Sequence, residues 1–152
     1  MGAPGLDHFA RLSVRVGTPV ELEASARGRR RLIPILGGTI SGRDFTGRIL
    51  PLGFDDQLIR TDRVADLHAE YAIEFDDGSR AMVTNVGVRV ADAEVTAALL
   101  RDEPVPAERV YFRTTPRITC GADRWAWLSE VVFLGCGMRR PGVVDMDFYI
   151  VR

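Results

Sequence analysis

His68 and Glu70 stand two positions apart in a segment of strictly alternating residues, so a strand would place both side chains on one face. An imidazole titrates near neutral pH, and a partly desolvated carboxylate can titrate close to it, so the pair could exchange protons with a substrate. The same face could instead be the solvent-facing surface of an ordinary antiparallel sheet. Because a closed barrel has an interior, we expect the pair to line an internal pocket.

A second candidate for chemistry is the acidic pair Asp55 and Asp56, which follows the breaker Pro51–Gly53. A carboxylate carried on a loop at the mouth of a barrel could abstract a proton from a substrate. Adjacent acids are also common turn formers, which is the alternative interpretation. We expect Asp55 to complement His68 and Glu70 in catalysis, and Asp56 to contact the substrate.

Arginine and aromatic side chains supply candidate binding groups. Alternation places Tyr111, Arg113 and Thr115 on one face of a predicted strand. Guanidinium donors stabilise developing oxyanions, so we expect Arg113 to stabilise an anionic intermediate, with an internal ion pair as the alternative. For Trp127 a place in the core is the more ordinary role. The substrate-binding candidates, besides Asp56, are Tyr71, Asn85, Arg89, Tyr111 and Trp127.

The composition of the chain argues against several chemistries. All 20 basic residues among the 152 are arginine, so there is no lysine amine for a Schiff base, a pyridoxal phosphate link or a Walker phosphate site. The two histidines and two cysteines lack zinc-like spacing, and we therefore expect neither a metal nor a cofactor. A net charge of −1 provides no basic field for nucleic acid or an anionic membrane.

No segment of the sequence predicts export or membrane insertion. The N-terminus lacks a basic stretch followed by an apolar run, which is the pattern of a secretory signal. The uncharged stretch Leu32–Gly42 is far shorter than the roughly 20 residues that a spanning helix needs. We therefore expect a cytoplasmic protein.

These candidate residues need a sheet to position them, and period-2 patterns separated by turn residues recur along the chain. The clearest hairpin joins Leu67–Phe75 to Arg80–Val90 through Asp77-Gly78. An N-cap at Asp92 predicts one short helix near residues 92–101. We expect an all-β fold, a closed or nearly closed antiparallel β-barrel of about nine short strands. Residues 1–152 would form a single domain, with residues 1–8 a flexible N-terminal segment.

Several ordered stretches from about residue 9 to the C-terminus resemble a microbial family known as domain of unknown function 3237. The resemblance implies a small barrel related in shape to lipocalin-like and allene-oxide-cyclase-like barrels, and it implies no activity. His68, Glu70 and Ser129-Glu130 depart from the residues typical of the family, and the first two add titratable groups. The matching stretches are Arg30–Gly38, Gly42, Gly47, Leu50-Pro51, Asp55, Gln57, Tyr71, Asp77-Gly78, Asn85, Gly87, Arg89, Tyr111–Thr114, Trp127-Leu128, Phe133, Gly135 and Gly137.

Together these patterns favour a cofactor-independent cyclase, isomerase or lyase that uses general acid–base catalysis on a hydrophobic, oxygenated small molecule, such as a natural-product intermediate. A lipocalin-like carrier that binds such a molecule without turnover is the alternative. A barrel with no cavity above about 300 Å³ would instead favour an interaction module. Small barrels often pair through strand faces, so a homodimer is also plausible.

Overall fold

The computed structural model describes residues 2–152, and strands make up most of that part of the chain. One α-helix, α1 (Ala93–Leu100), and two short 3-10 helices, η1 (Ala107–Arg109) and η2 (Ala126–Glu130), interrupt the strands. The strands are β1 (Leu6–Val16), β2 (Val20–Glu21), β3 (Arg29–Gly42), β4 (Thr46–Ile49), β5 (Phe54–Ile59), β6 (Val64–Phe75), β7 (Arg80–Val90), β8 (Tyr111–Thr119), β9 (Phe133–Arg140) and β10 (Val143–Val151).

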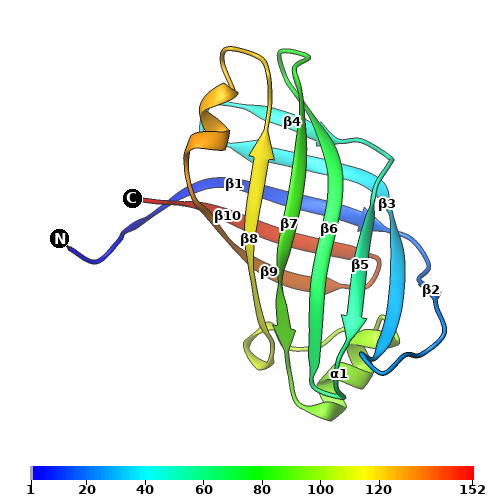
Figure 1. Ribbon diagram of the computed structural model, residues 1–152. Helices are drawn as coiled ribbons and strands as arrows, with labels where there is room; N and C mark the ends of the chain where they lie inside the picture. Colours follow the sequence, from blue (N-terminus) through cyan, green and yellow to red (C-terminus); the bar gives the residue numbers. More distant parts are fainter. Residues whose placement is uncertain (1) are drawn as a thin grey trace.

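The strands close into an antiparallel barrel, as predicted (Figure 1). The order around the barrel is β1, β10, β9, β8, β7, β6, β4 and β3, and the pairing of β3 with β1 closes the ring. β5 also lies between β3 and β6, beside the first half of β3, whereas β4 pairs with its second half. β2 is a short addition on β3, so the eight-position ring carries two extra strands.

The β6–β7 hairpin forms where the alternation and the Asp77-Gly78 turn predicted it. The two strands pair along their whole length, from Val64 opposite Val90 to Glu74 opposite Arg80. Gly78 adopts a φ of 83°, which a residue without a Cβ accepts readily. This long hairpin carries half of the ten candidate residues and fixes which of those share a face.

Helix α1 is also confirmed, and it lies at one end of the barrel (Figure 1). The side chain of Asp92 accepts a hydrogen bond of 2.9 Å from the backbone N–H of Val95, which is the predicted cap. The helix ends at Leu100, and Asp102, two residues further on, adopts a φ of 59°. The N–H of Glu103 then closes the end on the carbonyl of Ala98.

The ends of several elements differ from the sequence expectation. β1 begins at Leu6, because residues 6–8 pair with the last strand, so the segment from 1 to 8 is ordered in part; Met1 lies outside the described residues. The sequence pattern predicts a strand over Val131–Met138, but β9 begins at Phe133, after η2 has ended at Glu130. Across residues 2–152, no helix has the length and apolar character needed to cross a membrane.

Candidate functional site

His68 and Glu70 lie on the outer wall of the barrel. The side chain of His68 is 49% exposed, and its Nε2 is 3.1 Å from Oε1 of Glu70. The expectation that this pair lines an internal pocket is therefore wrong. A barrel of eight strands fills its interior with side chains, so the apolar face of β6, which carries Leu67 and Tyr71, is the face that becomes buried.

Four other predicted residues also lie on the outside, which corrects their expected place in a pocket. Asp56 forms an ion pair with Arg30, with 3.0 Å between Oδ1 and Nε. Tyr111 is 55% exposed, and the guanidinium of Arg113 lies 5.4 Å from the centre of its ring. Trp127 is 37% exposed on η2 rather than buried in the core.

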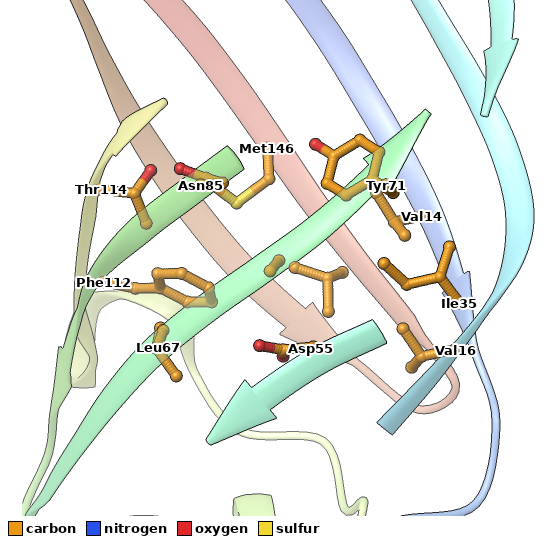
Figure 2. Close-up of a pocket in the computed structure, with 12 residues that line it drawn as sticks. Val14, Val16, Ile35, Asp55, Leu67, Tyr71, Asn85, Phe112, Thr114 and Met146 are labelled. Atoms are coloured by element: carbon orange, nitrogen blue, oxygen red, sulfur yellow. The ribbon is translucent and has the colours of Figure 1, made fainter. Parts of the chain in front are cut away.

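Asp55, Tyr71 and Asn85 do come together, around a cavity of about 40 Å³ inside the barrel (Figure 2). Asp55 belongs to β5 rather than to a loop. Successive side chains of a strand point to opposite faces, so Asp55 projects inward and Asp56 outward. The hydroxyl of Thr114 on β8 is the fourth polar group that lines the cavity. The other lining residues are Val14, Val16, Ile35, Leu67, Ala69, Phe112, Val144 and Met146.

Three of the polar groups in the cavity have no hydrogen-bond partner within residues 2–152. These are Oη of Tyr71, Oδ1 of Asn85 and Oγ1 of Thr114, all of them buried. Leaving a buried donor or acceptor unsatisfied costs about 1–3 kcal/mol for each group. Buried polar groups in folded proteins are nearly always paired with protein or with ordered solvent, so these three require partners inside the cavity.

Asp55 supplies the only carboxyl group among the described lining residues. Burial raises its pKa, while the hydrogen bond from Gln57 and the positive charges of Arg89 and Arg139 oppose that shift. Burial, and then the charge of Asp55, raises the pKa of Tyr71 well above its usual value. The phenol of Tyr71 therefore stays protonated at any ordinary pH and can donate a hydrogen bond.

Two glycines of β9 make room for the side chains that line the cavity. A Cβ atom at Gly135 would clash with Oγ1 of Thr114, and one at Gly137 would lie 2.6 Å from the ring of Phe112. Each contact is closer than real Cβ atoms allow. The Gly-Cys-Gly stretch of β9 therefore lets Thr114 and Phe112 occupy the space beside the cavity.

Asn85 and Arg89 share the inner face of β7 and both are buried, but of the two only Asn85 lines the cavity. Burial lowers the pKa of Arg89 to about 10, so its guanidinium remains charged at pH 7. Sequence reasoning missed Thr114, although even spacing puts it on the same strand face as the apolar Phe112 and Ile118, which was a signal that it faces inward. It also missed Gln57, which holds Asp55 in place.

The cavity is suited to organic oxygen atoms more than to a metal ion. Within residues 2–152, no three His, Cys, Asp or Glu side chains are grouped closely enough to hold a metal. Instead the cavity offers a phenol, a hydroxyl, an amide and a carboxyl in an apolar wall. Such a set orients a small molecule by hydrogen bonds while the apolar residues contact its carbon atoms.

Comparisons with known proteins agree with the sequence resemblance and with the fold. A family model described as "Protein of unknown function (DUF3237)" matches residues 4–151. A UPF0311 protein of Rhodopseudomonas palustris is 39% identical over 140 residues, which is 92% of both chains. A UPF0311 protein of Bradyrhizobium diazoefficiens is also 39% identical over 140 residues, covering 92% of this chain and 91% of the other.

Solved structures of similar proteins have the same barrel fold. A crystal structure of a conserved Rhodopseudomonas palustris protein matches with a TM-score of 0.94 and 36% identity, over 100% of this chain and 99% of the other. A β-barrel-like protein from Acinetobacter baumannii matches with a TM-score of 0.87 and 31% identity, over 100% and 98%. A structure described as an enzyme from Penicillium herquei shares the fold, with a TM-score of 0.75 and 16% identity over 100% and 97%.

Proposed function

The chain belongs to the DUF3237 family, and from that premise and the geometry of the cavity we propose that it binds a small oxygenated organic molecule inside its barrel. The observation that carries this proposal is the convergence of unpaired polar atoms from Tyr71, Asn85 and Thr114 on one mostly apolar cavity. A barrel that served only as a scaffold would gain stability from apolar residues at those positions. A guest with oxygen or nitrogen atoms supplies the partners that these groups lack.

The size of the cavity limits what the closed barrel can hold. A volume of about 40 Å³ suits a few water molecules, since one water needs roughly 10–15 Å³ by the same measure. This volume lies below the range of about 300–1,000 Å³ that is common for ligand pockets, and volume alone would favour an interaction module. The unpaired polar atoms support a guest that displaces this water, and such a guest requires the flexible side chain of the buried Met146 to move.

A second candidate function is catalysis by proton transfer, and Asp55 favours it. Burial raises the pKa of this carboxyl group, and a carboxyl group with a raised pKa is a better proton acceptor when ionised and holds its proton to higher pH. Oδ2 of Asp55 accepts a hydrogen bond from Gln57, while its second oxygen remains for the guest. Isomerisation or cyclisation of an oxygenated substrate fits such an acid, and the Penicillium herquei protein with the same fold is described as an enzyme. In this function Asp55 is the residue that exchanges protons with the substrate, a role that the sequence pattern predicted for His68.

The decisive experiment compares a filled cavity with an intact one. Ala69→Leu adds side-chain atoms to the cavity wall, whereas His68→Gln changes the outer wall next to it. Purified proteins would be incubated with metabolite extract from the producing organism, and retained and consumed compounds would be measured by mass spectrometry. We expect a compound that the wild type and His68→Gln retain and that Ala69→Leu loses at least about tenfold.

Equal retention by a folded Ala69→Leu protein would overturn binding inside the barrel. A retained compound that is recovered unchanged supports the carrier function. Consumption that stops in Asp55→Asn, but not in His68→Gln, supports catalysis. Circular dichroism of each variant confirms that the barrel is intact before the comparison is made.

A further inference from the structure

Three buried arginines approach one another at the α1 end of the barrel. Arg31 of β3 is 6% exposed, Arg89 of β7 is 4% exposed, and the side chain of Arg139 on β9 is 8% exposed. The pKa of Arg89 is lowered chiefly by burial and further by the charges of Arg139 and Arg31, while Asp55 opposes that shift. Several guanidinium groups are thus held near each other in a poorly hydrated region.

The protein provides only part of the negative charge that these groups need. Nη2 of Arg31 donates to the carbonyl of Leu100 over 3.2 Å, and its Nε lies 3.3 Å from an exposed Glu21 carboxylate. Nη2 of Arg139 donates to Asp102, but that carboxylate also accepts the N–H of a backbone glycine. Nε of Arg139 has no hydrogen-bond partner in the described chain.

Arg89 is the least compensated of the three. Within residues 2–152 its guanidinium has no carboxylate within ion-pair distance, and its buried Nη2 has no hydrogen-bond partner. Asp55 is the carboxyl group whose charge raises the pKa of Arg89, but burial favours the protonated form of that acid. A buried charge without a partner is costly, so an anion that reached this cluster would be strongly favoured.

A groove gives access from solvent to two of the three arginines, and Arg89 lies deeper, outside the groove lining. The groove has a volume of about 360 Å³, and both Arg31 and Arg139 line it. Val16 lines both this groove and the interior cavity, so the two hollows adjoin one another. A guest could place one end in the groove and the other end in the cavity.

We propose that Arg31, Arg89 and Arg139 form a carboxylate-binding subsite beside the cavity, and that the guest is therefore a small organic acid. This inference rests on the proposed binding function and names the substrate class for it. The planar guanidinium matches the two oxygens of a carboxylate, which explains why arginine suits this position. The interior groups of Tyr71, Asn85 and Thr114 would then hold an oxygen atom at the other end of the same molecule.

A simple pair of probes tests the subsite without knowledge of the natural guest. Acetate and acetamide have nearly the same shape, and only acetate carries a charge. Both would be titrated into wild-type protein at constant ionic strength, with the thermal unfolding midpoint and the NMR signals of the arginine Nε–H groups as readouts. We expect acetate to raise the midpoint in a saturable manner and to shift the Nε–H signals of Arg89 and Arg139, and acetamide to do neither.

Two variants locate the effect. Arg89→Met keeps the length and apolar stem of the side chain and removes its charge, and should weaken the acetate response at least about tenfold. Arg30→Met removes a neighbouring arginine whose side chain is 50% exposed and pairs with Asp56, and should leave the response unchanged. Equal responses to acetate and acetamide, or an acetate response unaltered in Arg89→Met, would overturn the subsite.

The subsite and the interior binding proposal fail in different ways. If the subsite is absent, acetate leaves the signals of Arg89 and Arg139 in place, while the Ala69→Leu comparison still reports on the cavity. If interior binding fails, Ala69→Leu retains the captured compound, whatever acetate does to the arginine signals.

Discussion

Nε2 of Gln57 donates a hydrogen bond to Oδ2 of Asp55 over 3.0 Å, and both residues project from the inner face of β5. This contact fixes the orientation of the carboxyl group and lowers its pKa against the effect of burial. Gln57 is 2% exposed, so little water competes for the contact. The pair therefore sets the protonation of the one acid that lines the cavity.

Replacing Gln57 by Leu should raise the pKa of Asp55 further. The substitution removes the hydrogen bond that stabilises the carboxylate and leaves the effect of burial in place. The titration of the Asp55 side-chain carbon by NMR measures the change directly. His68→Gln, on the outer wall, serves as the control and should leave that titration where it is. A lower or unaltered pKa in Gln57→Leu would contradict the assigned role of the contact.

The raised pKa of Asp55 predicts a pH dependence of stability. Because the folded state holds this proton more tightly than the unfolded state, Asp55 adds stability at pH values below its unfolded pKa of roughly 3.9. That contribution is lost as the pH rises through the folded pKa. The free energy of unfolding of the wild type relative to Asp55→Asn should therefore fall from acid toward neutral pH. Urea unfolding at a series of pH values measures it, and a difference that rises with pH would be inconsistent with a raised pKa.

Replacing Thr114 by Val should stabilise the protein and weaken guest binding. The two side chains have similar shapes, and Val removes a buried hydroxyl that has no partner in the described chain. We expect the free energy of unfolding to rise by about 1 kcal/mol in guest-free protein. Thr115→Val on the outer face is the matched control and should change stability by less. Destabilisation by Thr114→Val would show that the hydroxyl already has a strong partner.

His68→Gln should leave both binding and any turnover unchanged. The ring lies on the outer wall, where its contact with Glu70 is exposed to solvent. Exposed pairs contribute little, so we expect a change in the free energy of unfolding within about 0.5 kcal/mol. A loss of turnover of about a hundredfold would restore His68 as an acid–base residue and would contradict the cavity as the site.

The sequence was sufficient to predict the barrel, the β6–β7 hairpin and the helix after Asp92, because each depends on local patterns. It also separated the two faces of β6 correctly. The prediction was wrong in assigning the face of β6 that carries the titratable residues His68 and Glu70 to the inside of the barrel. In a barrel this narrow the buried face is the one that carries Leu67, Tyr71 and Ile73, because apolar burial outweighs any functional preference.

The rest of the site depends on which strands meet when the barrel closes, and local patterns do not reveal that. Arg31, Arg89 and Arg139 come from three strands far apart in the sequence and approach one another only when the ring closes. Thr114 lies between two exposed residues of β8 and carries no charge to mark it. Asp55 was predicted as a catalytic acid and Asn85 as a binding residue, and both line the cavity.

A crystal structure of the protein with the compound that it captures tests the central claim most directly. Our account predicts a polar atom of that compound within about 3.2 Å of at least two of the three oxygen atoms Tyr71 Oη, Asn85 Oδ1 and Thr114 Oγ1. A compound bound on the outer wall near His68, with these three oxygen atoms paired to one another or to nothing, would contradict it.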